Sequence, residues 1–505
     1  MSYTPNINLM LTPEDDTSTT FKQWRTGMNG EDSDSNMMKI DEAVGALDEH
    51  CDRLQAKVDT VSSKVFGESP QTWADVQTIV RSGAASQYFD VGDQFIVERL
   101  TGVTASVGES EGISAVTVDS NTFVDGMGEV HAGDYLFTYD GVSWRNEVGE
   151  IVNIETLGIT YTGTPTAGDN ITVTEASTQL AFDVIGIDHD TPADANHTHS
   201  MTLQLHNLWS STMTYDAAEA MFAVDAETYP DGLPAGTYNF TWNYATGSMV
   251  NGTYQFTIEQ PIPIGGQIVI ETNSSSTAIT SCKIKTYATA GATKTIETNI
   301  AIITGTEGTS LGTILSTTSS ATNLNCAQRI MWGSNNWSES SLRQWLNTDA
   351  AANSWWEPKT VFDRPANTDS VGFLKDLDPA FLDVIGDVTK TTQLSVSDDY
   401  GLETSTERFF LLSRPEVYAG TERSADGTDG TVYVYYGAGY SDLTAPGTGA
   451  DSNRIKYRNG SATYWWLRTP HSTVGGHVRN VHPTGSLNIY NANNSTGVAP
   501  ACVIV

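Results

Sequence analysis

An unbroken run of apolar residues at alternating steps of three and four is the feature that most constrains this chain. A 3.5-residue period sustained over about four heptads is typical of a left-handed coiled coil. The narrow apolar face predicts that the helix pairs with copies of itself, or lies on its own protein as an amphipathic helix. We expect self-association, with the helix ending near Gly67 and Pro70. After Met37, the oligomerisation positions are Ile40, Val44, Leu47, Cys51, Leu54, Val58, Val61 and Val65.

The heptads fit either a dimer or a trimer. Valine at one core position and leucine at the other favour two strands in simple peptides, but Ile40 and Val61 break that pattern. The polar, turn-rich segment 1–36 before the helix carries apolar residues such as Phe21 and Trp24, and we interpret it as a docking peptide.

Short alternating runs replace the helical period after Trp73. The runs FDVGDQFIVER, ISAVTVDS, GDYLFTYDGVSW and NITVTEA predict strands separated by Gly and Asp turns, and thus an all-β module over 70–187. The polar stretch 188–200 is a predicted linker. Renewed alternation over 201–303 predicts a second β module of the sandwich or prism type.

The last section, 304–505, mixes helical and strand patterns. SESSLRQWLNT and FLKDLDPAFLDVIG predict helices, and short strands follow, among them TVYVYYG, ATYWWLRT and VAPACVIV. Helices followed by short strands indicate an α+β domain. The predicted fold class is therefore multidomain and mainly β, with an N-terminal coiled-coil helix, β-sandwich or prism-like modules and a C-terminal α+β domain.

Composition excludes several classes of function. The net charge of −35 repels nucleic acid and anionic membrane. We see no signal peptide and no run of 18 apolar residues, so we expect no membrane insertion. The four cysteines, Cys51, Cys282, Cys326 and Cys502, are far apart and form no CxxC pair, which fits folding in a reducing cytoplasm.

The last section resembles the C-type-lectin-like domains of bacteriophage and gut-bacterial proteins. That group includes tail proteins diversified by retroelements and shares its fold with formylglycine-generating enzymes. The strings that carry the resemblance are RIMWGSNNWSESSLRQWLNT, RFFLLSRPEVY, SNRIKY, YWWLRTP and GVAPACVIV. A coiled coil before β modules and a lectin-like head is similar to a trimeric phage receptor-binding protein. The resemblance implies a homotrimer that joins tail or baseplate proteins through its N-terminus.

Two apolar strings, YWWLRTP and VAPACVIV, bracket a segment rich in His, Asn, Gly and Ser. We expect both strings to be buried strands of one sheet, which would present the segment between them. In the family, binding residues lie in this part. The residues that the resemblance implies for ligand binding are His471, Ser472, Val474, His477, Arg479, Asn480, His482, Asn488, Tyr490, Asn491, Asn493 and Asn494. The alternative is an inert polar loop. Most tryptophans are expected in the core, with Trp355 and Trp356 the candidates to reach the surface.

Catalytic and metal motifs are lacking in the sequence. The calcium-binding strings of C-type lectins are not present, and the nearest string, Glu357-Pro358-Lys359, has a lysine where a calcium ligand is needed. No phosphate loop, HExxH or GxSxG occurs. His197 and His199 could bind an axial metal in a trimer, but a solvated turn is the simpler interpretation. We expect no cofactor and no enzyme.

These features predict a phage tail adhesin, assembled in the host cytoplasm and carried on the virion. Residues 1–36 would dock to the particle, 37–66 would form a trimer, and the head would bind a host-cell surface protein or glycan. Two rival hypotheses remain: a purely structural baseplate or decoration protein, and a hydrolase of surface glycans, for which a carboxylate pair would be required.

Overall fold

The computed structural model describes residues 70, 72–108, 112–119, 122, 134–217, 222–224, 226–243, 251–264, 266–271, 282–287, 296–300, 308–315, 326–357, 366–418, 420–437 and 449–505. The chain divides into two compact units, residues 1–76 and 77–505. Helix α3 (Trp73–Arg81) crosses the division and is followed by the short helix α4 (Ala85–Tyr88). The predicted docking segment 1–36 and the predicted coiled coil 37–66 lie outside the described residues.

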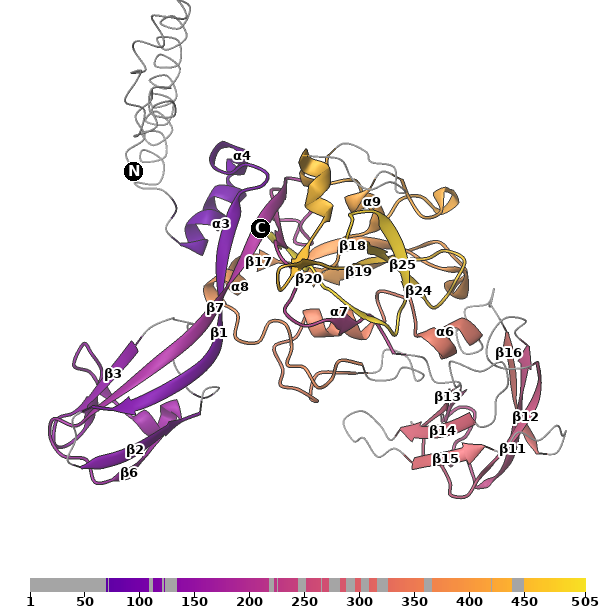
Figure 1. Cartoon of the computed structure of the whole chain (residues 1–505), viewed down its shortest axis with the longest axis horizontal. Helices are drawn as coiled ribbons and strands as arrows, with labels where there is room; N and C mark the ends of the chain where they lie inside the picture. Colours follow the sequence, from indigo (N-terminus) through magenta and orange to yellow (C-terminus); the bar gives the residue numbers. More distant parts are fainter. Residues whose placement is uncertain are drawn as a thin grey trace, which may run out of the picture. The chain divides into compact units, whose positions relative to one another are not determined.

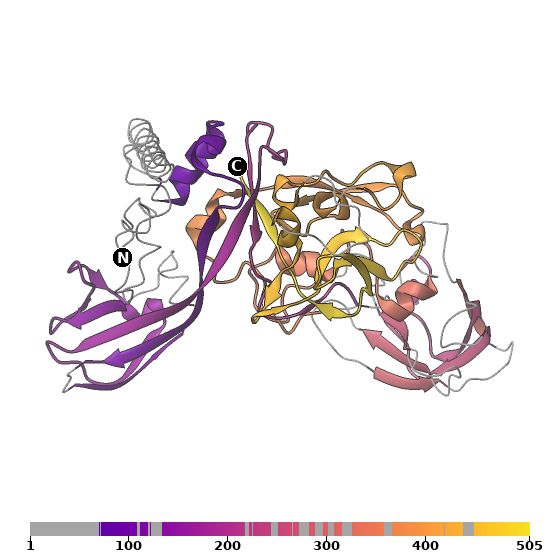
Figure 2. The ribbon, with the colours of Figure 1, turned by 45° about the horizontal axis from the view of Figure 1, so that its top comes forward.

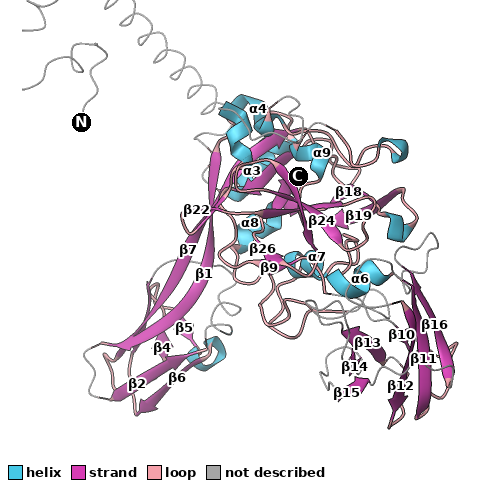
Figure 3. Cartoon of the chain, turned by 45° about the vertical axis from the view of Figure 1, so that its right-hand side comes forward, coloured by secondary structure: helices cyan, strands magenta, loops and turns pink. Residues whose placement is uncertain are grey.

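Strands dominate the described chain, as the alternating patterns predict. The structure is mainly β and contains several sheets. Figure 3 shows strands in each region, whereas the helices are short. Among the described helices, none is long and apolar enough to span a membrane.

A nine-stranded sheet links segments from far apart in the sequence. Its main path is β17-β27-β8-β7-β3-β4-β5, with β1 paired to β7 and β20 paired to β27. The strands are β1 (Gln94–Val107), β3 (Asp134–Tyr139), β4 (Trp144–Arg145), β5 (Ile151–Val152), β7 (Asn170–Ile187), β8 (Met201–Leu205), β17 (Ile385–Gly386), β20 (Phe409–Phe410) and β27 (Ala501–Ile504). The pairing of β1 with β7 is the long antiparallel ribbon of Figures 1 and 2.

Strand β7 changes character along its length. Burial alternates from Asn170 to Glu175, where β7 pairs with β1 and β3 and one face packs on a core. From Phe182 to Gly186 every residue is buried, which is typical of a strand covered on both faces. Here β7 pairs with β8 and so enters the C-terminal section.

The first β module, residues 94–187, has its own apolar core. Strand β2 (Ile113–Val118) pairs with β6 (Ile159–Gly163), and the 3₁₀ helix η2 (Ile154–Leu157) precedes β6. Asn153 caps η2 by accepting a hydrogen bond from the backbone N–H of Glu155. The core residues are Ile113, Phe137, Trp144, Ile154, Leu157, Ile159, Ile171 and Val173.

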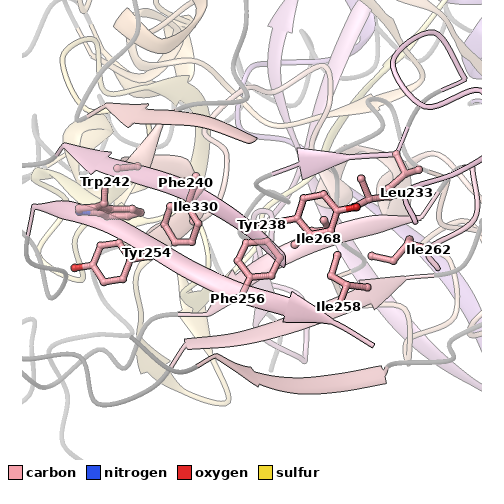
Figure 4. Packing of buried hydrophobic residues seen from close by; sticks show 12 residues of the cluster. Leu233, Tyr238, Phe240, Trp242, Tyr254, Phe256, Ile258, Ile262, Ile268 and Ile330 are labelled. Atoms are coloured by element: carbon pink, nitrogen blue, oxygen red, sulfur yellow. The ribbon is translucent and has the colours of Figure 1, made fainter. Parts of the chain in front are cut away.

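The second β module has an aromatic core. Its strands are β10 (Phe222–Ala223), β11 (Gly236–Asn243), β12 (Gly252–Ile258), β13 (Gln267–Glu271), β14 (Cys282–Tyr287), β15 (Ile296–Ile300) and β16 (Thr309–Leu315). They form two sheets, β12-β11-β16 and β10-β13-β14-β15. Side chains of β11 and β12, such as Phe240 and Phe256, share one interior with Ile330 (Figure 4).

Strand pairing groups the chain differently from the predicted boundaries at 187, 200 and 303. Strand β8 pairs with β7 and β27, so it belongs to the C-terminal section and not to the second β module. Strand β16 pairs in parallel with β11, so the second module extends to residue 315. The predicted linker 188–200 connects two hydrogen-bonded strands, and its Asp190 is held by the side chains of Thr202 and Lys390.

We call the described residues 201–217 and 326–505 the head. Its helices are α6 (Ala327–Trp332), α7 (Ser341–Leu346), α8 (Pro379–Val384) and α9 (Arg414–Val417), with the 3₁₀ helices η4 (Val396–Asp398), η5 (Ser424–Asp426), η6 (Val434–Tyr436) and η7 (Gly449–Arg454). Ser340 caps α7 and Asp378 caps α8, each by accepting a backbone N–H of the first turn. Both predicted helices of this section are therefore confirmed, in shorter form.

The remaining head strands form small sheets. They are β9 (Met213–Thr214), β18 (Val388–Gln393), β19 (Leu402–Glu407), β21 (Tyr457–Arg458), β22 (Ser461–Ala462), β23 (Trp465–Pro470), β24 (His477–Val481), β25 (Leu487–Asn491) and β26 (Ser495–Thr496). Strands β18 and β19 form a hairpin, and β23, β24 and β25 form a three-stranded antiparallel sheet.

Three details of the head differ from the sequence predictions. YWWLRTP and VAPACVIV do not share a sheet, because β23 pairs with β24 whereas β27 pairs with β8, β17 and β20. TVYVYYG contains the 3₁₀ helix η6 and not a strand, with Tyr433 and Tyr436 buried. Trp355 is mostly buried, with only 7% of its surface exposed, and its indole N–H donates to the carbonyl of Ser370.

Candidate binding surface on the head

The sheet β23-β24-β25 carries half of the predicted binding residues. Strand β24 carries His477, Arg479 and Asn480, and β25 carries Asn488, Tyr490 and Asn491. His471, Ser472 and Val474 lie in the turn before β24, and His482 lies in the turn after it. Asn493 and Asn494 follow β25 and are exposed. The segment from His471 to Asn494, which we call the presented segment, is thus a compact hairpin with its flanking turns.

The register of β24 and β25 separates these residues into two sets. His477 pairs with Asn491 and Arg479 with Ile489, so these four side chains share one face. Asn480 pairs with Asn488 and Val478 with Tyr490, so these four share the other face. The pattern predicts which side chains can act together on one ligand.

The face of His477 and Arg479 is tied to Glu422. Arg479 donates to Glu422 in a bidentate pair, Nε–Oε2 2.7 Å and Nη2–Oε1 2.6 Å. Arg414 donates to the same carboxylate at 2.8 Å, and the backbone N–H of Ser472 donates to Oε1 at 3.3 Å. Burial raises the pKa of Glu422, but Arg479 and Arg414 overcome this and lower it. Glu422 therefore stays ionised and fixes the guanidinium of Arg479.

The turn that precedes β24 is held by buried side chains of the head. Asn335 donates to the carbonyls of Val474 (2.9 Å) and His477 (3.0 Å), and its own carbonyl accepts from Ser395 (3.1 Å). The backbone N–H of Val396 donates to the carbonyl of Ser472 at 2.7 Å. These bonds give a polar turn a fixed shape.

Close packing at two glycines adds to this fixation. A Cβ on Gly475 would lie 1.9 Å from Oγ of Ser397, and one on Gly476 would lie 2.7 Å from the carbonyl of Gln328. Because real Cβ atoms do not approach so closely, the turn accepts only glycine at Gly475 without movement.

The two histidines of the presented segment are kept neutral. Burial lowers the pKa of His471 and of His477, and the positive charge of Arg479 lowers both further. Their ring centroids lie 6.2 Å apart, and the ring of His477 also packs on Trp332 at 5.4 Å. At pH 7 these imidazoles can therefore donate or accept a hydrogen bond.

Asn480 is turned into the protein, whereas Tyr490 keeps part of its surface exposed. Asn480 is fully buried, and neither amide atom has a hydrogen-bond partner among the described residues. Tyr490 is half-buried, with its ring 4.7 Å from that of Tyr464. Of the predicted set, Asn480 is therefore closed to a partner in this structure, whereas His471, His477, Asn491, Asn493 and Asn494 retain exposed surface.

A buried charge cluster supports β23 from within the head. Arg468 of β23 makes a bidentate pair with Glu416 (2.6 and 3.0 Å), and Lys390 binds both Glu416 (2.8 Å) and Asp190 (2.6 Å). Burial raises the pKa of Glu416, but Arg468 and Lys390 overcome it and hold the pKa at about 2. The cluster joins β18, α9 and β23 with the 188–200 segment.

Sequence patterns did not find Glu422, Asn335 or Glu416. The string Ser413-Arg414-Pro415-Glu416 has the spacing of a capping box, and Glu416 does accept the backbone N–H of Ser413 at 2.8 Å. The capping-box spacing could therefore have identified Glu416 as a structural residue from the sequence. Asn335 carries no linear signal, since its partners lie 60 or more positions away. Glu422 pairs with Arg414, eight positions before it, but its partners in the presented segment, Ser472 and Arg479, lie 50 or more positions further along the chain.

Residues 312–505 match the family model of DUF6273, a domain of unknown function. Comparison with curated proteins and comparison with solved structures found no match. The DUF6273 match includes α6 to α9, the presented segment and β27. Strand β8 lies outside the match, yet it fills the place between β7 and β27 in the sheet. The folded unit around the matched residues therefore includes residues from before residue 312.

The metal and thiol candidates are also placed by the structure. His199 lies 3.2 Å from Asp188, and His197 lies 3.8 Å from Asp194. No group of three or more metal-ligating side chains occurs in the part of the chain that the structure describes. Cys326 and Cys502 are buried free thiols, and burial raises the pKa of Cys502 well above its usual range, which keeps that thiol protonated.

Proposed function

We propose that the chain is a bacteriophage tail adhesin whose head binds a host-cell surface molecule through the presented segment. In this proposal residues 1–36 dock to the virion and 37–66 form a trimeric coiled coil. The β modules support heads of the C-type-lectin-like type. The chain acts by binding and not by catalysis.

The observation that carries the proposal is that hydrogen bonds, an ion pair and close packing fix the conformation of His471–Asn494. A segment rich in histidine and asparagine is fixed by Asn335, Glu422 and the close packing at Gly475. A rigid scaffold under chemically varied side chains is the arrangement of recognition surfaces, because ordering the segment in advance reduces the entropy lost on binding.

The side chains left at the surface are suited to hydrogen bonding. Asn493 and Asn494 are exposed, Asn491 and His477 are half-buried neighbours on one face, and both histidines are neutral. Such a surface offers donors and acceptors without a strong charge. It fits a glycan or a polar protein surface on the host, and it needs no calcium.

Cell binding by the full-length protein tests the proposal. The test variant changes His477, Asn491 and Asn494 to Ala, because these side chains reach the surface and carry none of the Glu422 contacts. The control variant changes Thr389, Thr391 and Thr404 to Ala on the β18–β19 hairpin, which carries none of the predicted binding residues. Binding to candidate host cells is measured by flow cytometry with labelled protein.

We expect the test variant to lose at least tenfold in apparent affinity and the control to match the parent, with equal melting temperatures. Equal binding by both variants would place the contact surface elsewhere and refute the role of His471–Asn494. Failure of the parent to bind every candidate host would favour the structural baseplate hypothesis. Release of reducing ends from host polysaccharide would favour the hydrolase.

A further inference from the structure

A polar pocket lies on a different part of the head. It is formed by α7, the loop that follows α7, the end of β19 with the next residue Arg408, and Asp387 just before β18. Its volume is about 440 Å³. This size falls within the range of small-molecule sites. The lining residues are Arg343, Gln344, Asn347, Thr348, Trp355, Glu357, Leu374, Asp387, Thr406 and Arg408.

The side-chain amides of Asn347 and Gln344 form hydrogen bonds with the backbone that surrounds the pocket. Asn347 donates to the carbonyls of Arg343 and Phe409 and accepts from the backbone N–H groups of Arg408 and Phe409. Gln344 bonds both backbone polar groups of Glu357, at 2.8 and 2.9 Å. These contacts make the pocket a formed cavity and leave its ligand chemistry to other residues.

The two arginines of the pocket differ in their partners. Arg343 is paired with buried Glu407 at 2.8 Å and also donates to the carbonyls of Ser338 and Thr406. Arg408 donates to the carbonyl of Leu382 and makes no ion pair with any residue in the described ranges. The guanidinium of Arg408 thus retains unused N–H donors beside the cavity.

An arginine without an ion pair is notable in this chain, which has 61 acidic and only 26 basic residues. A planar guanidinium with free donors matches a carboxylate in a bidentate pair. The remaining free donors therefore favour a ligand that carries a carboxylate.

The other lining groups favour a sugar as the body of that ligand. The indole N–H of Trp355 is already donated to Ser370 at 2.8 Å, so the part of its ring toward the pocket is carbon. Asp387 is exposed at the rim, and its carboxylate can accept hydrogen bonds from hydroxyl groups. Carbon surface beside acceptors suits a pyranose, which has an apolar C–H face and hydroxyl edges.

We propose that this pocket binds a hexuronic acid unit of an acidic glycan. Arg408 binds the sugar carboxylate, Asp387 accepts sugar hydroxyls, and Trp355 packs against the C–H face. The site is separate from the His471–Asn494 segment, and the proposal does not depend on the function assigned to that segment.

Ligand-observed NMR with the full-length protein tests this site. The probes are methyl β-D-glucuronide, methyl β-D-glucoside as the neutral match, and inorganic phosphate as a competitor. The variant Arg408→Gln removes the proposed carboxylate ligand. Arg145→Gln, in the first β module, removes one surface positive charge and serves as the control. Asp387→Asn changes an exposed residue of the same pocket. It provides a second test of the site in case the Arg408→Gln variant does not fold.

We expect the glucuronide to bind at least tenfold more tightly than the glucoside. Arg408→Gln should lose at least tenfold in affinity, since a charge-assisted pair is removed, and Asp387→Asn should lose severalfold. Arg145→Gln should match the parent.

Several results would overturn the proposal. One is absence of glucuronide binding. Another is equal affinity for the glucoside and the glucuronide. A third is a folded Arg408→Gln variant that binds the glucuronide as the parent does. Displacement of the glucuronide by an equal concentration of phosphate would show a general anion site and also contradict recognition of the sugar. If Arg408→Gln does not fold, unchanged binding by Asp387→Asn refutes the proposal.

Discussion

Glu416 lies at the centre of the buried charge cluster of the head. Its carboxylate is buried and compensates two cations, Arg468 and Lys390, which are also buried. Removing one partner of a buried ion pair is costly because the remaining charge keeps its desolvation penalty. The folded carboxylate titrates with a pKa of about 2, below the ordinary value of 4.5.

The depressed pKa of Glu416 predicts acid sensitivity. Above pH 4.5 the residue is ionised in both the folded and the unfolded chain, so its contribution is fully present. As pH falls from about 4.5 toward 2, the unfolded chain takes up the proton first and stability is lost, by roughly 3 kcal/mol in total. Glu416→Gln should lower the free energy of unfolding by about 3 kcal/mol at pH 7 and flatten the acid dependence.

Urea unfolding followed by tryptophan fluorescence at several pH values measures both effects. Glu227→Gln serves as the control, because Glu227 is an exposed glutamate of the second β module. Equal unfolding midpoints for Glu416→Gln and the parent at pH 7 would contradict the assigned role of the charge cluster.

Single residues were predicted from sequence with uneven success. Composition identified His471–Asn494 as a polar segment between two apolar strings, and both strings are buried. The prediction that the two strings share a sheet was wrong. The burial of Asn480 was not predictable, because it depends on the register of β24 against β23 and β25. Glu422 and Asn335 were missed because only the folded chain brings them to this segment.

The turn before β24 is the element on which the proposed recognition depends. Gly475 meets Ser397 so closely that an added methyl group must displace one of them. We expect Gly475→Ala to destabilise the head by about 1–3 kcal/mol, the usual cost of overpacking, and to weaken cell binding through a moved turn. Thermal unfolding and the cell-binding assay measure the two effects.

A glycine with free space around it supplies the control for this element. A Cβ on Gly102 in β1 would meet nothing within 4 Å, so Gly102→Ala should change stability by less than about 0.5 kcal/mol. If Gly475→Ala behaved like Gly102→Ala, the turn would be looser than its contacts indicate.

Strands as elements were predictable from alternation, whereas their partners were not. The strings around β1, β2, β3 and β7 alternate clearly and form the strands expected. The pairings of β8 with β27 and of β16 with β11 join residues far apart in sequence, and local patterns carry no information on such pairs. For TVYVYYG the strand itself was wrongly predicted. Its β-prone residues form the 3₁₀ helix η6, and Tyr433 and Tyr436 are buried there.

At the scale of the whole molecule, the heptads predict that attachment is multivalent. Leu47→Asp with Leu54→Asp places charges in the apolar seam and should convert the proposed trimer to a monomer. Three linked heads bind with a high effective concentration, so the apparent affinity for cells should fall by about 10²-fold. Sedimentation gives the mass, and flow cytometry gives the affinity.

Asp48→Asn with Asp52→Asn is the matched control, since these residues lie between the seam positions. That variant should keep the mass and affinity of the parent. A parent that sediments as a monomer would contradict self-association through 37–66 and would remove multivalency from the proposed mode of attachment.

The place of β27 in the sheet has a consequence for biosynthesis. Gln204 of β8 donates its side-chain amide to the carbonyl of Ala499, 295 positions further along the chain. While the ribosome is still translating the second β module and the rest of the head, β8 has no strand on its β27 side. The sheet can close only after β27 itself has been translated and has left the exit tunnel. The nascent chain therefore carries an open β edge on β8 until β27 emerges, a state that chaperones commonly protect.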